Sequence, residues 1–272
     1  MSETMNIAPE FADCFKKIGL QSIDDVFKFS GGENLVKENL ASFRQRIKFE
    51  TENPKTTLFL KRYENIPALK QIDNWLSRRK IISTMDCDRM PAEILSRLGI
   101  NVPKTVAFGV QWQDAAGVGF EKRSFIITEK VPNAESLEKK LPAIFFRDKK
   151  KFIESLAAFV SKFHKTGFRH RDLYLCHIFC DDAGKFTLID LNRVFKPVFL
   201  GGRFLVKDLA QLYYSSPGSV ITRTDRLRFY LAYAGKTKLS ICDRILIRKI
   251  KSRAKQMAQH DRKHNRIPPF EN

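Results

Sequence analysis

The chain has 272 residues, enough to bury a substantial core as one large domain or as two lobes that share a cleft. A hydrophobic fraction of 43%, with 23 Phe residues, excludes an intrinsically disordered protein. Lys and Arg number 49 against 30 Asp and Glu, so the net charge of +19 predicts attraction to polyanions. The charge alone does not distinguish nucleic acid, an anionic membrane leaflet, nucleotide phosphates or a phosphorylated glycolipid.

Residues 1–15 contain neither a basic leader nor an apolar run, and no stretch approaches the roughly 20 apolar residues that a membrane-spanning helix needs. The sequence therefore predicts a cytoplasmic protein.

The cysteines are odd in number and lack the regular spacing of a disulfide-rich domain, which predicts reduced thiols and no disulfide. They are Cys14, Cys87, Cys176, Cys180 and Cys242.

The first sixty residues predict helices followed by strands. Residues Phe11–Ile18 predict a short helix, and Ser22 followed by Asp25 can cap a second one. From Glu33 to Arg62 the apolar pattern and a turn-rich interruption predict two or three antiparallel strands, the last of which ends at Lys61.

The middle of the chain predicts a helical stretch and two more strands. Residues Ile66–Leu98 have a helical pattern with a break, because Pro91 removes a backbone donor and is expected to begin a new helix. Residues Thr105–Val110 and Arg123–Thr128 alternate like strands on either side of a loop at residues 114–119. The N-terminal half is therefore predicted to be a sheet with helices.

The remainder is predicted to be mainly helical. Asp148 can cap a long amphipathic helix that ends before Gly167. A small hairpin is expected at residues 177–191, with its turn at residues 181–184.

The segment His170–His177 reads His-Arg-Asp-Leu-Tyr-Leu-Cys-His and lies between that helix and that hairpin, as a kinase catalytic loop does. Phosphoryl transfer needs a carboxylate that orients and deprotonates the attacking hydroxyl, and Asp172 is placed for this role, with Arg171 beside it. It also needs ligands that hold Mg²⁺ against the β- and γ-phosphates. His177 and Asp190 take those places.

Lys61 is the predicted phosphate ligand. A lone cation on an apolar strand usually turns outward, whereas in a kinase this lysine holds the α- and β-phosphates and pairs with a helix glutamate. Glu93 is the predicted partner, and Asp88 is the alternative because Pro91 makes the helix register uncertain. The strand that reaches Glu129 resembles the one leading to the hinge between kinase lobes, where backbone groups would meet adenine.

On these residues the chain resembles the lipopolysaccharide core kinases of the WaaP type, the heptose and Kdo kinase family. Their order along residues 61–214 is more specific than any single motif. The further matching segments are Val106–Gly109, Ser124–Glu129, Ile189–Arg193 and Lys207–Tyr213.

The resemblance implies an α+β, bilobal protein-kinase-like fold, with an antiparallel-sheet N-lobe at residues 1–128 and a helical C-lobe at residues 129–272. It implies a bacterial enzyme that uses ATP and Mg²⁺ to phosphorylate an inner-core sugar, heptose or Kdo, at the cytoplasmic face of the inner membrane. By residue, it implies Asp172 as base, Asp190 as metal ligand and Lys61 as phosphate ligand.

Two features depart from typical protein kinases. No glycine-rich loop lies between the first strands, where residues 39–42 are the best candidate for covering the phosphates. Asp190 is followed by Leu-Asn instead of Phe-Gly, as expected for sugar kinases of this type.

Other ligand hypotheses concern polyanions and zinc. Residues 244–266 are rich in Lys and Arg and predict either a solvated helix face or a helix on anionic lipid or lipopolysaccharide phosphates. Arg193 and Lys196 are further hypothetical contacts to the glycolipid.

The residue types of Cys176, His177 and Cys180 suggest a zinc site, but their spacing argues against one. On a strand this spacing would direct the ligands to opposite faces. No recognised nucleic-acid motif is present.

Two rival functions stay open. A non-catalytic pseudokinase could use the same fold to bind a polyanion at a membrane, which the missing glycine-rich loop and His177 favour. A small-molecule kinase of the aminoglycoside or choline type is the second alternative. The presence of Lys61, Asp172 and Asp190 favours an enzyme.

Overall fold

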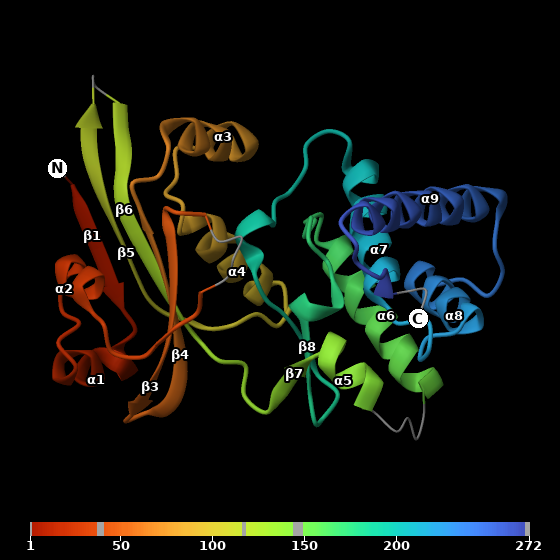
Figure 1. Ribbon diagram of the computed structural model, residues 1–272, viewed down its shortest axis with the longest axis horizontal. Helices are drawn as coiled ribbons and strands as arrows, with labels where there is room; N and C mark the ends of the chain where they lie inside the picture. Colours follow the sequence, from red (N-terminus) through yellow and green to blue (C-terminus); the bar gives the residue numbers. More distant parts are fainter. Residues whose placement is uncertain (1, 37–40, 116–117, 144–148, 270–272) are drawn as a thin grey trace. The chain divides into compact units, whose positions relative to one another are not determined.

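The computed structural model describes residues 2–36, 41–115, 118–143 and 149–269 (Figure 1). The chain forms two compact units: an N-terminal unit of residues Met1–Ile94 and Pro103–Val131, and a C-terminal unit of residues Leu95–Val102 and Pro132–Asn272. The sequence pattern places a boundary near Thr128 and does not indicate that Leu95–Val102 belongs with the second unit.

The N-terminal unit is built on a six-stranded antiparallel sheet with the strand order β1-β5-β6-β4-β3-β2 (Figure 1). The predicted strands are confirmed, but β4 continues past Lys61, and β5 and β6 extend into the predicted loop at residues 114–119. The strands are β1 (Glu3–Ile7), β2 (Glu33–Asn34), β3 (Arg44–Glu52), β4 (Lys55–Glu64), β5 (Thr105–Ala115) and β6 (Val118–Glu129).

Strand β1 is not predicted by the sequence. Only Met5 and Ile7 alternate toward the core, and two apolar residues are too few for a period-two signal. The strand pairs with β5, where Gly109 lies opposite Met5. A Cβ at Gly109 would lie 3.0 Å from the Thr4 carbonyl oxygen and 2.6 Å from the Phe125 ring, so a residue without a side chain permits this close approach.

Alternation along β4 separates the two faces of the sheet. Leu58 and Leu60 are buried on one face, in a cluster with the short helices α1 (Ala12–Lys17) and α2 (Ile23–Lys28), which follow the 3₁₀ turn Pro9–Phe11. Tyr63 is buried on the other face with residues that include Ile66, Met85 and Ile126. Lys61 alternates with Leu60 and so lies on the same face as Tyr63.

The helical stretch between β4 and β5 divides into α3 (Ala68–Arg78) and α4 (Asp86–Arg97). The prediction that Pro91 begins a new helix is wrong, because α4 runs through it and the break falls before Asp86. Pro91 lies in the second turn, where its missing N–H removes one i→i−4 hydrogen bond while later turns remain intact.

Glu121 of β6 fastens the segment that leads into α4. Its side chain is only 2% exposed, and its Oε2 accepts hydrogen bonds from the backbone amide (2.6 Å) and hydroxyl (2.8 Å) of Thr84. Within the described residues its other carboxylate oxygen is buried without a hydrogen-bond partner. Burial therefore raises the pKa of Glu121 to about 7.

We expect Glu121 to make stability depend on pH near neutrality. Its folded pKa lies above its usual value of 4.5, so the native state binds more protons and the free energy of unfolding falls as the pH rises from about 4.5 through about 7. The loss from this group is at most about 3 kcal/mol. Urea unfolding at pH 5 and pH 8 should show a smaller pH difference for Glu121→Gln than for the wild type, and equal pH differences would contradict the assignment.

The C-terminal unit combines a small sheet with five helices in the described part of the chain. The sheet has the order β7-β8-β9, and β8 and β9 confirm the predicted hairpin. Helix α6 packs against α8, and α7 packs against α9. Asp148, the predicted cap of α6, lies outside the described residues. The elements are β7 (Ala134–Ser136), α5 (Leu137–Ala143), α6 (Lys149–Lys165), β8 (Ile178–Asp181), β9 (Phe186–Leu188), α7 (Gly201–Ser215), α8 (Arg223–Ala234) and α9 (Ile241–Lys263).

None of the helices in the described ranges combines the length and apolar character that crossing a bilayer requires.

Candidate active site

The loop that carries Asp172 is held in place by Asp208 of α7. Asp208 is completely buried, and its two carboxylate oxygens accept the backbone amides of His170 (2.8 Å) and Arg171 (2.7 Å). Arg171 has a positive φ of 68°, a backbone conformation that residues other than glycine adopt only at a cost in free energy. The two hydrogen bonds that the loop amides donate to Asp208 offset that cost.

A buried histidine of α6, His164, supports Asp208. Burial lowers the pKa of His164, so its ring is neutral at physiological pH. Its Nε2 lies 3.3 Å from Asp208 and its Nδ1 lies 2.9 Å from the Tyr233 hydroxyl. The consistent arrangement has Tyr233 donating to Nδ1 and Nε2–H donating to the carboxylate.

Two further polar residues of α7 continue this support along the same helix face. Gln211 donates to the Arg171 carbonyl oxygen (2.9 Å) and accepts the Leu173 amide (3.0 Å), and Ser215 accepts the Leu175 amide (3.0 Å). These residues follow Asp208 at i+3 and i+7, and all three are buried. The sequence pattern does not assign them a role. Their signal in the sequence is a row of polar residues at helical spacing among the apolar residues of α7.

The Asp172 carboxylate is 22% exposed and lies among cations. Arg193 donates to both of its oxygens (3.1 and 3.0 Å), and Lys207 Nζ lies 3.9 Å from Oδ1. Burial lowers the pKa of Lys207. Arg193, predicted as a glycolipid contact, is therefore engaged with the predicted base. Lys196 lies against Gly167.

His177 and Asp190 are brought together beside this loop. His177 Nδ1 lies 2.7 Å from the Asp172 carbonyl oxygen, so this nitrogen carries the proton and Nε2 presents its lone pair. Nε2 lies 3.9 Å from Asp190 Oδ2, and both side chains are partly exposed. Asp190 has a φ of 55°, just before the 3₁₀ turn Leu191–Arg193.

These two residues fit a divalent cation. Mg²⁺ is bound in proteins through one or two carboxylates and completes its coordination with substrate phosphates and water. Asp190 supplies the carboxylate, and the hydrogen bond at Nδ1 orients the His177 ring as such partners do for metal-binding imidazoles. The pair thus matches the prediction in position, while metal binding itself stays a prediction.

Arg171, predicted to be catalytic, points its guanidinium toward aromatic rings. The group lies 5.3 Å from the Phe195 ring centroid and 5.9 Å from that of Phe204. These contacts hold the side chain beside the loop at Asp172, and a catalytic role for Arg171 stays a prediction.

In the N-terminal unit Lys61 pairs with Asp88 and not with Glu93. Lys61 Nζ lies 3.2 and 3.1 Å from the two oxygens of Asp88, which also accepts the Tyr63 hydroxyl (3.0 Å). Glu93 is 43% exposed and pairs with Arg89, four residues before it on α4. The prediction of Glu93 is corrected to Asp88, because the register of α4 directs Asp88 toward β4.

We expect this difference to appear in nucleotide binding. Replacing Asp88 with alanine removes the carboxylate that orients Lys61. On the prediction that Lys61 holds the phosphates of ATP, the KM for ATP should rise by about tenfold or more, a loss typical of a partly buried charged pair. Glu93→Ala removes an exposed helix pair and should change KM less than about twofold. A larger effect at Glu93 would show that the pairing in solution is different.

Glu129 ends β6, and its backbone amide already donates to the Lys104 carbonyl oxygen (2.9 Å). The amide of Lys130 donates likewise to Thr57 (2.9 Å). These two donors are therefore used within the N-terminal unit, and the contact of other backbone groups near Glu129 with adenine stays a prediction. The predicted phosphate-covering segment at residues 39–42 lies partly outside the described residues.

Comparison with known proteins identifies the family. Residues 83–233 match the model of the lipopolysaccharide kinase (Kdo/WaaP) family. The chain is 31% identical over 206 residues to the lipopolysaccharide core heptose(I) kinase WaaP of Escherichia coli K12, covering 71% of this chain and 75% of that protein. It is also 31% identical over 156 residues to WaaP of Pseudomonas aeruginosa, covering 51% and 55%.

A solved structure supports the fold. The structure of WaaP in complex with acyl carrier protein matches 96% of this chain and 97% of that chain, with a TM-score of 0.61 and 23% sequence identity. This likeness confirms the predicted α+β, bilobal protein-kinase-like fold. The match to the family model over more than half of the chain, and the 31% identity to WaaP of Escherichia coli K12, show that the chain belongs to the lipopolysaccharide kinase (Kdo/WaaP) family.

Proposed function

We propose that the protein transfers the γ-phosphoryl group of ATP to a hydroxyl of heptose I in the lipopolysaccharide core. The observation that carries this proposal is the loop at Asp172, whose backbone is fixed by Asp208 and Gln211 and whose neighbours include the His177–Asp190 pair. The choice of heptose follows from the relatives, which are named heptose(I) kinases.

In this proposal the residues divide the work of phosphoryl transfer. Asp172 orients the sugar hydroxyl and accepts its proton, and Arg193 keeps that carboxylate in one orientation. Lys61, itself oriented by Asp88, holds phosphate oxygens of ATP. Asp190 with His177 holds Mg²⁺, which when bound neutralises charge on the phosphates. The rate enhancement then comes mainly from positioning and charge neutralisation.

The test is transfer to defined acceptors. We expect the purified protein with Mg-ATP to add one phosphate to heptose I of lipopolysaccharide that lacks it, as detected by mass spectrometry of the core. An acceptor that ends at Kdo should gain nothing. ATP binding without transfer to any lipopolysaccharide fragment would support the pseudokinase alternative, and transfer to a soluble amino-alcohol would support the small-molecule kinase.

We propose that the enzyme works at the cytoplasmic face of the inner membrane, drawn there by α9. Its only two acidic residues are engaged inward: Asp243 is buried, and Asp261 accepts the Tyr214 hydroxyl. The exposed face is cationic, which suits anionic lipid. Its exposed cations are Arg244, Arg248, Lys249, Lys251, Arg253, Lys255, Arg262 and Lys263.

Salt tests this electrostatic contact. The part of vesicle binding that depends on α9 should disappear when salt shortens the Debye length from about 10 Å to about 3 Å. The double variant Lys249→Glu with Arg253→Glu should lose the same part at low salt. Binding that responds to neither change would exclude a role for α9.

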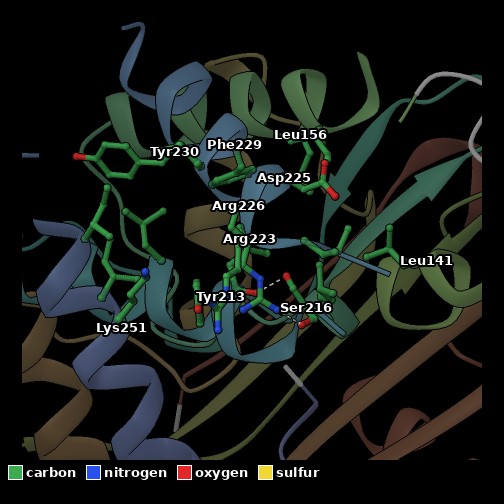
Figure 2. Close-up of a pocket in the computed structure, with 18 of the residues that line it drawn as sticks. Leu141, Leu156, Tyr213, Ser216, Arg223, Asp225, Arg226, Phe229, Tyr230 and Lys251 are labelled. Carbon is green, nitrogen blue, oxygen red and sulfur yellow. Dashed lines mark hydrogen bonds between the residues drawn. The ribbon is translucent and has the colours of Figure 1, made fainter. Parts of the chain in front are cut away.

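We also propose acyl carrier protein as a partner, because the solved WaaP structure is a complex with one. The observation that favours it is a cavity of about 310 Å³ inside the C-terminal unit, lined mainly by aliphatic and aromatic side chains of α5 to α9 (Figure 2). An apolar cavity of this volume lies within the range of ligand pockets and suits an acyl chain. Arg223, Arg226 and Lys251 are among its lining residues.

Acylated carrier protein should therefore raise the temperature at which half of this protein is unfolded, whereas carrier protein without an acyl chain should not. Ile247→Trp, which fills part of the cavity, should abolish the shift, and Ile245→Trp on the outer side of the same helix should preserve it. Equal shifts with both forms of the carrier would contradict the acyl-chain site.

A further inference from the structure

Helix α3 turns its apolar side outward. Leu69, Ile72 and Leu76 follow one another at i, i+3 and i+7, so they form one face of the helix. Their exposed fractions are 82%, 37% and 73%, and Ile81, just after the helix, is 63% exposed. Single exposed apolar residues are ordinary, but a helical stripe of them marks an interaction site.

The side of α3 that faces the sheet is polar and forms hydrogen bonds. Gln71 is buried, and its side chain donates to the carbonyl oxygens of Ile66 (3.0 Å) and Glu121 (3.1 Å) and accepts the Glu121 amide (2.8 Å). Asn74, one turn later on the same side, is also buried. Gln71 thus bonds to the Glu121 backbone of β6 through both its amide N–H and its amide oxygen. Rotating the helix to bury Leu69 and Leu76 would break the three buried hydrogen bonds of Gln71.

The end of the helix is fixed as well. Trp75 donates its Nε1–H to the Ile82 carbonyl oxygen (2.9 Å), and its ring lies 5.3 Å from that of Phe120 on β6. This contact ties the helix and the following turn to the sheet, beside which α3 lies in Figure 1. The outward orientation of the leucines is thus built into the N-terminal unit.

The charged residues beside the apolar stripe indicate which partner binds it. Arg78, Arg79 and Lys80 follow Leu76 closely, and Asp73, the only acid of α3, is paired with Lys70 (3.1 Å). An amphipathic helix with an apolar face and cations at its boundary is the arrangement that lies in the interface of an anionic bilayer. The net charge of +19 disfavours a second copy of the same chain on this face.

We propose that α3 docks in the headgroup region of an anionic membrane, inserting Leu69, Ile72 and Leu76 among the acyl chains while Arg78 to Lys80 contact lipid phosphates. This contact differs from the electrostatic attraction of α9, because it buries apolar surface. Its test needs neither ATP nor a sugar acceptor, so it stands or falls independently of the proposed kinase reaction.

The experiment is co-sedimentation with vesicles of phosphatidylcholine with and without phosphatidylglycerol. Leu69→Glu combined with Leu76→Glu should lower partitioning onto the anionic vesicles by about ten- to a hundredfold, since two leucines are no longer buried and two negative charges are added. Both sites are exposed, so folding should be unaffected. Val36→Glu combined with Val198→Glu adds the same two charges at exposed apolar residues outside α3 and α9, and this matched control should bind like the wild type.

Two further measurements distinguish insertion of α3 from purely electrostatic binding and from self-association. In a Trp112→Phe background, Trp75 fluorescence should shift to the blue on anionic vesicles, and part of the binding should persist in high salt. Unchanged partitioning of the Leu69→Glu, Leu76→Glu variant would overturn the proposal. A wild-type dimer in light scattering that this variant abolishes would instead assign the stripe to a second copy of the chain and would also overturn it.

Discussion

Replacing Asp172 with asparagine is expected to lower the turnover number for phosphoryl transfer by about 10²–10⁴-fold, the range for losing a general base. Asparagine has the same shape and can still accept hydrogen bonds from Arg193, but it cannot take the proton of the sugar hydroxyl. The ion pair with Arg193 is half exposed, so the free energy of unfolding should change by less than about 1 kcal/mol. Steady-state kinetics and urea unfolding of the same preparation measure both quantities.

The matched control is Asp182→Asn. Asp182 belongs to the same unit and lies in the turn between β8 and β9, where its side chain is 88% exposed. This variant should keep wild-type turnover. If Asp172→Asn retained more than about a tenth of the wild-type turnover, Asp172 would not be the base, because even a modest general base contributes more than that.

Replacing Asp208 with alanine is expected to have the largest effect on stability, about 3–5 kcal/mol of unfolding free energy. The change would leave the buried amides of His170 and Arg171 and the Nε2–H of His164 without their acceptor. The loop at Asp172 would lose its attachment to α7, so turnover should fall as well. Circular dichroism with urea gives the stability, and single-turnover transfer gives the chemical step.

A graded series keeps this prediction testable if the alanine variant does not fold. Asp208→Asn preserves one acceptor oxygen and should lose less stability than alanine. Tyr233→Phe removes only the outer end of the chain of hydrogen bonds through His164 and should cost about 0.5–1.5 kcal/mol. Equal stability of the wild type and Asp208→Asn would show that the carboxylate does not hold the loop.

Local sequence determined much of the site. The segment His170–His177 and the hairpin ending at Asp190 are close in the chain, so the order of helix, loop and hairpin was enough to predict that Asp172, His177 and Asp190 belong together. The strand that carries Lys61 was equally evident, because period-two alternation depends only on neighbouring residues.

Partners distant in the chain decided the rest. The choice of Asp88 over Glu93 depends on where α4 begins and on which of its faces meets β4, and Pro91 misled the prediction because its effect depends on its turn in the helix. The support from Asp208 likewise joins segments 38 residues apart.

Helix α3 illustrates the general reason. Its sequence determines an apolar stripe at helical spacing, and such a stripe normally predicts the buried side. Here the backbone of Glu121, 50 residues further along the chain, hydrogen-bonds to Gln71 and turns the polar side inward. The sequence alone thus determined which residues share a helix face, and only the tertiary structure decided which face is buried, because burial depends on what the rest of the chain places beside it.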